Sequence, residues 1–159
     1  MNGVVFDFDG VLADSEAISW DAWREVLRPY GVNVSDDDMV TCTGTSSRDT
    51  YVHFARRGYL PPYREVLAAV DRHRRGRYPR ELRVFPDAVN AVQALAMAGV
   101  PLAVASSSSR RNLDLKLEVL GLGRYFGDTE AGDEVPRGKP APDLYHEAVR
   151  RIGIVADDS

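Results

Sequence analysis

The sequence contains almost none of the residues that build a disulfide framework or a cysteine-based zinc site. Cys42 is the single cysteine among 159 residues, so an intrachain disulfide and a set of cysteine ligands are both excluded. Such sparing use of cysteine is typical of a reducing compartment, and we expect a cytoplasmic protein. The three histidines, at positions 53, 73 and 146, do not have the spacing of metal ligands.

Long hydrophobic runs are also missing. No stretch of about 18 consecutive apolar residues occurs, and acidic residues interrupt the first segment at positions 7, 9, 14 and 16. We therefore expect neither a signal peptide nor a membrane partner. A formal net charge of -4 supplies no general attraction for nucleic acid, and we expect no nucleic-acid partner. With 44% hydrophobic and 28% charged residues, the composition is that of an ordinary globular protein.

Lysine is nearly absent from the basic residues. Of the 20 lysines and arginines, only Lys116 and Lys139 are lysines. Because arginine supplies the ordinary surface charge of this chain, a lysine in a motif-like segment carries more information than usual. The densest basic run, between Arg72 and Arg83, has no aromatic stacking platform beside it. This run therefore predicts a solvated helix face or a hinge rather than a phosphate or nucleic-acid surface.

Hydrophobic periodicity divides the chain into two kinds of segment. Residues 3–8 are apolar and β-branched, which predicts a buried strand, whereas residues 15–83 have helical spacing almost throughout. Strand and helix patterns then alternate, with strands expected at 101–105 and near 125–130, and a last helix at 142–152. This alternation predicts an α/β protein with a right-handed parallel sheet, interrupted after its first strand by the helical block.

The sharpest local signal is Asp-Phe-Asp-Gly at residues 7–10. Alternation along a strand would place Asp7 and Asp9 on one side of the backbone, and Gly10 would let the chain turn away. Two adjacent carboxylates repel each other unless a cation lies between them, and Mg²⁺ is a suitable one. An aspartate in this position can also be a nucleophile that forms an aspartyl-phosphate. An ordinary turn at the end of a strand would explain the tetrapeptide equally well.

Two further segments gain meaning from their setting. Ser106 is expected at the carboxyl end of the second strand, beside the aspartates, where ligands bind in open α/β sheets. Its hydroxyl and nearby amides could bind an anion, although a serine-rich helix cap is the simpler interpretation. Lys139 lies in a proline-stiffened loop, and its compact charge could neutralise a phosphate and screen the aspartates. Exposed loop lysines are common, so this signal is weak alone.

Taken together, residues 7–16, 104–108 and 138–143 resemble the first three motifs of the haloacid dehalogenase superfamily, in the same order and settings. Within it, the chain is similar to the branch of β-phosphoglucomutase and phosphoglycolate phosphatase, in which a helical cap follows the first motif. The resemblance implies a three-layer, Rossmann-like parallel sheet with an inserted all-helical cap. The implied boundaries are 1–14 and 84–159 for the core and 15–83 for the cap.

The resemblance also implies roles for individual residues. Asp7 would be the nucleophile that takes the phosphoryl group, and Asp9 the general acid and base. A Mg²⁺ cofactor would be bound by the Asp7 carboxylate and the Asp9 main-chain carbonyl. Ser106 and Ser107 would hold the phosphoryl oxygens, and Lys139 would stabilise their charge. Positioning and electrostatics dominate phosphoryl transfer, so these groups could supply most of the catalysis.

The expected activity is Mg²⁺-dependent hydrolysis of a small phosphorylated metabolite, a sugar phosphate or phosphoglycolate, through an aspartyl-phosphate. Gly44, Ser46 and Arg48 of the cap would contact the substrate when the cap closes. Mutases of this branch carry a cap-side histidine soon after the first motif, where this chain reads Glu-Ala-Ile-Ser-Trp at 16–20. This difference favours a phosphatase over the alternative of a sugar-phosphate mutase. The sequence does not fix the oligomeric state.

The family's fourth motif is an acidic pair that completes the Mg²⁺ shell after a further strand. Here Gly153 is followed closely by Asp157, Asp158 and Ser159, too soon for the usual loop and a complete strand. We therefore expect this segment to be a linker and the core to be incomplete at its C-terminus. An inactive fragment that only binds phosphate is the corresponding alternative.

Overall fold

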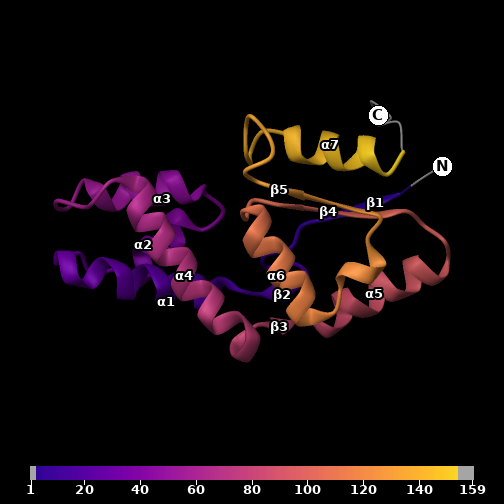
Figure 1. Ribbon diagram of the computed structural model, residues 1–159, viewed down its shortest axis with the longest axis horizontal. Coiled ribbons are helices and arrows are strands. Elements are labelled where there is room, and N and C mark those ends of the chain that lie inside the picture. Colours follow the sequence, from indigo (N-terminus) through magenta and orange to yellow (C-terminus); the bar gives the residue numbers. More distant parts are fainter. Residues whose placement is uncertain (1–2, 154–159) are drawn as a thin grey trace. The chain divides into compact units, whose positions relative to one another are not determined.

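The computed structural model of the chain describes residues 3–153. It contains two compact units, one of them inserted into the other (Figure 1). Met1–Ser15 and Leu82–Ser159 form the core unit, and Glu16–Glu81 form the helical unit. No helix within residues 3–153 is long and apolar enough to cross a membrane.

Within residues 3–153, the centre of the core unit is a parallel sheet of three strands. Its strands are β1 (Val4–Phe6), β4 (Leu102–Ser106) and β5 (Asp128–Ala131), in the order β1-β4-β5. Val5 pairs with Ala103, and β4 also pairs in parallel with β5. Every residue of β4 is buried, as expected for a central strand covered on both faces.

Helices cover both faces of this sheet. α7 (Asp143–Arg151) lies on one face, and α5 (Pro86–Met97) and α6 (Arg110–Leu120) lie on the other (Figure 1). Leu144 and Ala148 of α7 belong to the same buried cluster as two alanines of β4. A short 3-10 helix, η2 (Gly123–Tyr125), connects α6 to β5. This three-layer arrangement confirms the α/β fold class predicted from the alternation of strands and helices.

The chain leaves and re-enters the core unit through a small antiparallel ladder. β2 (Ala13–Asp14) pairs with β3 (Arg83–Val84), so the segments that flank the insertion lie side by side. The amide of Phe85 extends this pairing by donating to the Leu12 carbonyl at 3.0 Å. The ladder explains how a long insertion can follow the first strand without separating it from the rest of the sheet.

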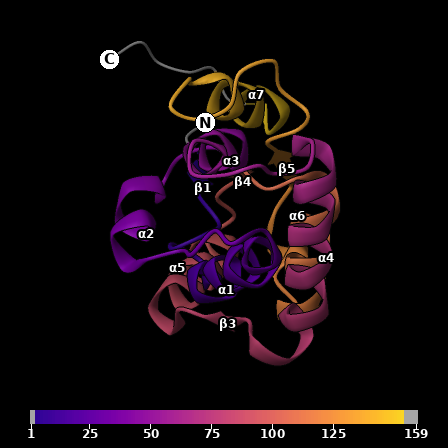
Figure 2. The ribbon, with the colours of Figure 1, turned by 90° about the vertical axis from the view of Figure 1, so that its left-hand side faces the viewer.

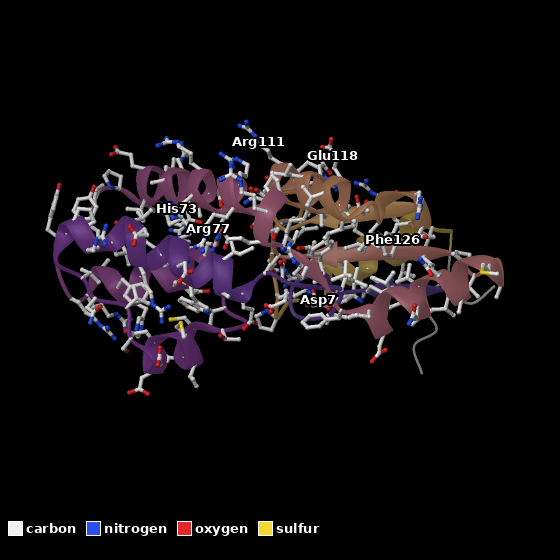
Figure 3. All side chains as sticks on the ribbon, turned by 90° about the horizontal axis from the view of Figure 1, so that it is seen from below. Asp7, His73, Arg77, Arg111, Glu118 and Phe126 are labelled. Carbon is white, nitrogen blue, oxygen red and sulfur yellow. The ribbon has the colours of Figure 1, made fainter. Side chains whose placement is uncertain are left out.

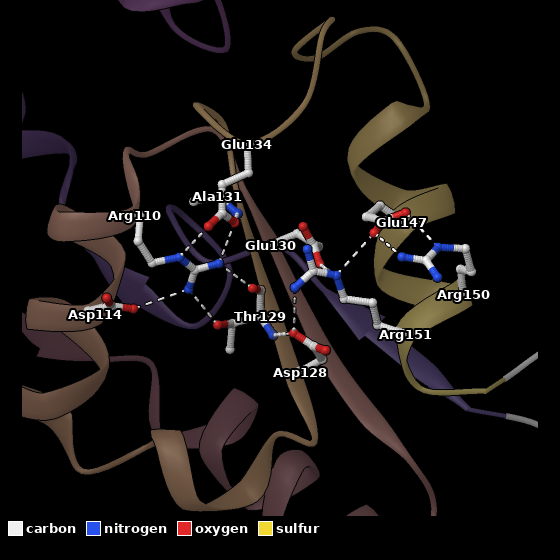
Figure 4. A network of polar contacts seen from close by, with 10 residues as sticks. All are labelled: Arg110, Asp114, Asp128, Thr129, Glu130, Ala131, Glu134, Glu147, Arg150 and Arg151. Atoms are coloured by element: carbon white, nitrogen blue, oxygen red, sulfur yellow. Dashed lines mark hydrogen bonds and ion pairs between the residues drawn. The ribbon is translucent and has the colours of Figure 1, made fainter.

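The edge strand β5 is tied to both helical layers by charged side chains (Figure 4). Arg110 of α6 donates to Thr129 Oγ1 at 2.7 Å and to Glu134 Oε1 at 2.9 Å. Arg151 of α7 lies 2.7 Å from the buried carboxylate of Glu130. Burial raises the pKa of Glu130, and the Arg151 charge opposes that rise. These charges also discourage another strand from pairing with the edge.

The helical unit is built on a core of its own, which includes Trp23, Phe54 and Val70. Its longest helix packs against the helix that begins the unit, and the arrangement of the unit's helices can be followed in Figure 2. The elements are α1 (Glu16–Leu27), the 3-10 helix η1 (Arg28–Tyr30), α2 (Asp36–Cys42), α3 (Ser47–Ala55) and α4 (Tyr63–Glu81).

Part of the basic run in α4 packs against α1 rather than forming a solvated face. Arg74 donates to Ser19 Oγ at 2.5 Å, and its side chain is only 13% exposed. Arg77 lies 2.9 Å from Asp21 and 2.7 Å from Glu81, and Figure 3 labels its side chain on α4. The expected solvated face or hinge does not describe Arg74, which is mostly covered, whereas Arg77 stays 30% exposed. The partners of both arginines on α1 are not visible in the spacing of α4 itself.

A buried carboxylate joins two elements of the helical unit. Asp38 is 3% exposed and accepts hydrogen bonds from Ser35, His53 and Arg57. The hydrogen bonds from Arg57 lower the pKa of Asp38 most, burial opposes them, and His53 and Ser35 add to the lowering. The net result is a pKa well below the ordinary range, so Asp38 is a structural anion that links the start of α2 to the end of α3.

We expect Asp38→Asn to destabilise the helical unit by about 2 kcal/mol, because charge-assisted hydrogen bonds are lost from a buried site. The folded pKa of Asp38 is lowered, so its contribution is complete above about pH 4 and is lost as the pH falls below that value. Both tryptophans of the chain, Trp20 and Trp23, lie in this unit, so urea unfolding followed by tryptophan fluorescence measures it directly. Asp37→Asn, at an exposed position of the same helix, is the control. Equal stability of the two variants would refute the prediction.

Close backbone approach in the core unit requires a glycine after β5. A Cβ atom on Gly132 would lie 2.5 Å from the Ser107 carbonyl oxygen, and the Gly132 amide donates to the Ser108 carbonyl at 2.8 Å. This contact joins the loops at the carboxyl ends of β4 and β5.

We expect Gly132→Ala to destabilise the core unit by about 1–3 kcal/mol, because one of the two loops must move to admit the methyl group. Gly123→Ala is the matched control, since its Cβ would meet Leu117 Cβ at an ordinary 4.0 Å. Amide hydrogen exchange in β4 and β5 measures the effect, and unchanged protection in Gly132→Ala would contradict it.

Candidate active site

A tight turn after β1 places two aspartates at the carboxyl end of the strand. The Phe8 carbonyl accepts hydrogen bonds from the amides of Leu12 and Ala13 at 2.9 and 3.2 Å, and the Phe8 ring is fully buried. Gly10 has a φ of +77°, a left-handed conformation that glycine adopts without strain. The buried phenylalanine and the glycine together fix the backbone on both sides of Asp9.

Asp7 follows the last residue of β1 and is held by two donors. Its Oδ1 accepts from the Phe8 amide at 2.7 Å and lies 2.8 Å from Lys139 Nζ. The Asp7 side chain is 33% exposed, so small molecules can reach it; Figure 3 marks its position. Lys139 Nζ also donates to the Ala105 carbonyl at 3.1 Å and lies 5.0 Å from the Tyr145 ring centre. Lys139 therefore links the ends of β1 and β4.

Asp9 is surrounded by a different set of donors. Ser15 Oγ and Lys116 Nζ each lie 2.5 Å from its Oδ1. Ser106 Oγ and Ser108 Oγ each donate to its Oδ2 at 3.1 Å. Burial raises the pKa of Asp9, but the Lys116 charge and hydrogen bonds from Lys116, Ser15 and Ser108 outweigh it and lower the pKa to about 2. Asp9 is therefore an anion in this arrangement.

The serines after β4 differ in their surroundings. Ser106 is fully buried, and its hydroxyl donates to Asp9 while it accepts from the Ser108 amide at 3.1 Å. Ser107 is exposed, and its backbone is the one that Gly132 approaches. At the start of α6, the Arg110 amide already donates to the Asp133 carboxylate at 2.8 Å.

The structure brings Asp7, Asp9, Ser106 and Lys139 together at the carboxyl ends of β1 and β4. The expected alternation does not place the two aspartates, because β1 ends at Phe6, before either of them. Instead each aspartate has a lysine of its own.

Ser15, Ser108 and Lys116 contact the Asp9 carboxylate, although none of the three was predicted from the sequence as a site residue. Lys116 left a signal that could have revealed it, because it lies between Leu113 and Leu117 on the buried face of α6. A lysine within an apolar helical stripe needs a buried anion as its partner.

The expected substrate contacts of the cap lie around the start of α3. Gly44 has a φ of +79° after α2, and Arg48 is exposed in the first turn of α3. Ser46 caps this helix, since its Oγ accepts from the Asp49 amide at 3.1 Å and donates to the Asp49 carboxylate at 2.6 Å. A role in substrate binding stays a prediction for all three residues.

The donor chemistry at the end of β1 suits a hard cation. Among residues 3–153 there is no group of three or more histidine, cysteine, aspartate or glutamate side chains placed to hold a metal ion. Mg²⁺ does not require one, because it is commonly held by one or two carboxylates, with water and substrate phosphate completing its shell. Asp7 and Asp9 supply such oxygen donors. Asp157 and Asp158, considered above as further ligands, lie outside the described residues.

Comparison with known proteins places the chain in a family. The sequence model described as haloacid dehalogenase-like hydrolase matches residues 4–159. The phosphorylated carbohydrates phosphatase of Thermotoga maritima is 28% identical, over 99% of this chain and 73% of its own length. The fructose-1-phosphate phosphatase YqaB of Escherichia coli is 29% identical, over 96% and 80% respectively.

The fold is similar to that of solved structures as well. The crystal structure of CbbY from Rhodobacter sphaeroides in complex with phosphate has a TM-score of 0.85 with this chain, at 24% identity. The alignment covers 96% of this chain and 72% of that one. Motifs, sheet and relatives agree, and the chain belongs to the haloacid dehalogenase-like hydrolase family.

Proposed function

We propose that this protein is a Mg²⁺-dependent phosphatase that hydrolyses a small phosphorylated metabolite, a sugar phosphate or phosphoglycolate, through an aspartyl-phosphate on Asp7. The observation that carries the proposal is the partly exposed Asp7 carboxylate at the end of β1, with Lys139 Nζ 2.8 Å away. The similarity to phosphatases of phosphorylated carbohydrates supports the substrate class.

Asp7 is suited to be the nucleophile. The Phe8 amide and Lys139 fix one of its oxygens, so the carboxylate has a defined orientation before substrate binds. Attack on phosphorus would form the Asp7–phosphate bond and release the metabolite's oxygen. Water would then attack the same phosphorus atom and regenerate the free carboxylate, with inorganic phosphate as the product.

Asp9 is suited to exchange protons with the reacting oxygens. As an anion, Asp9 can accept the proton of the water that attacks the aspartyl-phosphate. The proton held in this way would then pass to the leaving oxygen of the next substrate molecule, so that the proton is balanced over one turnover. Ser106 and Ser107, at the end of β4, are the proposed ligands of the phosphoryl oxygens. Lys139 would neutralise the charge that these oxygens share.

Mg²⁺ would be held by the Asp7 carboxylate and the Asp9 main-chain carbonyl. When bound, it would supply positive charge to the phosphoryl oxygens. We further propose that the helical unit is the cap and that Gly44, Ser46 and Arg48 help to select the substrate.

Asp7→Asn is expected to lower kcat by about 10³-fold or more, since an amide cannot form the covalent intermediate. The measurement is release of inorganic phosphate from p-nitrophenyl phosphate and from a panel of sugar phosphates and phosphoglycolate, with Mg²⁺ and with EDTA. Asp87→Asn, an exposed aspartate at the start of α5, is the control. Wild-type rates in Asp7→Asn would refute the assigned nucleophile.

The same assay separates the alternatives. Conversion of a sugar phosphate to its positional isomer without release of phosphate would show a mutase. Binding of inorganic phosphate without turnover would show a phosphate-binding protein that is not an enzyme.

Lys139→Met is expected to lower kcat by about 100-fold and to weaken inhibition by inorganic phosphate, because one cationic donor to the phosphoryl group is lost. Lys139→Arg should recover only part of the activity, since a planar guanidinium does not occupy the place of a compact ammonium. Steady-state kinetics measures both effects. An unchanged inhibition constant for phosphate in Lys139→Met would exclude direct contact between Lys139 and the phosphoryl group.

A further inference from the structure

Both lysines of the chain contact the aspartates of the site, one each. Lys139 Nζ lies 2.8 Å from Asp7, and Lys116 Nζ lies 2.5 Å from Asp9. All the other basic residues are arginines. The proposed roles above use Lys139 but leave Lys116 without one.

Lys116 is a buried cation whose position is closely fixed. It lies on the apolar face of α6, and its side chain is 1% exposed. Its ammonium lies 4.7 Å from the centre of the Phe8 ring, within the range of a cation–π contact. A buried ammonium is costly unless an anion and hydrogen-bond acceptors surround it, and Asp9 is such an anion.

The same ammonium also orders the serine beside Asp9. Lys116 Nζ donates to Ser108 Oγ at 2.7 Å, and Ser108 Oγ donates to Asp9 Oδ2 at 3.1 Å. The Ser108 amide in turn donates to the hydroxyl of Ser106. Lys116, Ser108 and Asp9 thus each contact the other two.

We propose that Lys116 is a positioning residue for Asp9 in the proposed reaction, holding its carboxylate away from Asp7 and Lys139. Without Lys116, Lys139 would be the one remaining lysine, and both carboxylates would compete for its ammonium. The two carboxylates would also repel each other with only one ammonium to offset their charge. With Lys116 present, Asp7 pairs with Lys139 and Asp9 pairs with Lys116, so the two carboxylates do not share a cation. The effect on turnover rests on the proposed function, whereas the pairing of Lys116 with Asp9 does not.

Lys116→Met tests the effect on turnover, because methionine retains an unbranched, apolar side chain of similar length without the charge. We expect kcat to fall about 100-fold, as for a misplaced reacting group. The KM and the inhibition constant of inorganic phosphate should stay within about twofold of wild type, because Lys116 does not touch the substrate. Lys116→Arg should recover part of kcat by restoring the charge. Lys139→Met, which is expected to change the phosphate inhibition constant, is the contrasting variant.

Thermal unfolding by circular dichroism establishes a temperature at which each variant is folded, and rates are compared there. An unchanged kcat in folded Lys116→Met would overturn the proposal and leave Lys116 as a purely structural residue. If Lys116→Met does not fold, two other measurements test the positioning role. These are the kinetics of Lys116→Arg and the NMR spectra of ¹⁵N-lysine-labelled protein that are described in the next paragraph.

The presence of only two lysines allows a second test that does not depend on activity. In protein labelled with ¹⁵N-lysine, a buried ammonium is protected from exchange, and Lys116→Met or Lys116→Arg identifies its resonance. We expect Asp9→Asn to shift the Lys116 ammonium resonance and Asp7→Asn to leave it near its wild-type position. An unchanged Lys116 resonance in Asp9→Asn would refute the pairing and with it the positioning role. If the wild type releases no phosphate while the Asp9 shift is seen, the proposed function and the role in turnover both fall, and the pairing alone stands.

Discussion

Repulsion between two carboxylates that lie two residues apart in the chain is the constraint on which the rest of the site depends. Asp7 and Asp9 follow a strand of only three residues, and neither of them lies within a helix or a strand. Each is stabilised by a separate ammonium, at 2.8 Å for Asp7 and 2.5 Å for Asp9. Opposite charges at this distance attract strongly wherever water is partly excluded. The structure around β1 must therefore place one lysine beside each aspartate and hold the two lysines at separate positions.

The three layers of the core unit meet this requirement. Lys116 comes from α6 on one face of the sheet, and Lys139 comes from the loop before α7 on the other face (Figure 1). β4, between β1 and β5, adds its terminal serine to Asp9 and its Ala105 carbonyl to Lys139. Charged contacts from Arg110 and Arg151 tie the same two helices to β5 (Figure 4). The sheet thus serves as a frame that fixes the two lysines relative to β1.

Sequence alone predicted the parts of this arrangement that local pattern encodes. The aspartates follow an apolar strand, and Lys139 lies in a motif of unusual composition, so both could be recognised and ordered along a parallel sheet. Lys116 could be suspected only from its place in an apolar helical stripe, and Gly132 not at all, because their roles come from contacts between distant segments. Lys116 meets Asp9 across 107 positions of the chain, and Gly132 is constrained by the backbone of Ser107. The packing of Arg74 and Arg77 on α1 was missed for the same reason.

A physical difference between lysine and arginine bears on why lysine pairs with Asp7 and with Asp9. In the helical unit, Arg57 donates to both carboxylate oxygens of Asp38, an arrangement that fixes a structural anion. A guanidinium in the place of Lys116 would bring its planar fork to Asp9 in the same way and compete with Ser106 and Ser108 for Oδ2. The Lys116 ammonium contacts Oδ1 of Asp9, which also accepts from Ser15, whereas Oδ2 accepts from Ser106 and Ser108. Of the 20 lysines and arginines, the two lysines are thus the ones that pair with the carboxylates that the proposed reaction uses.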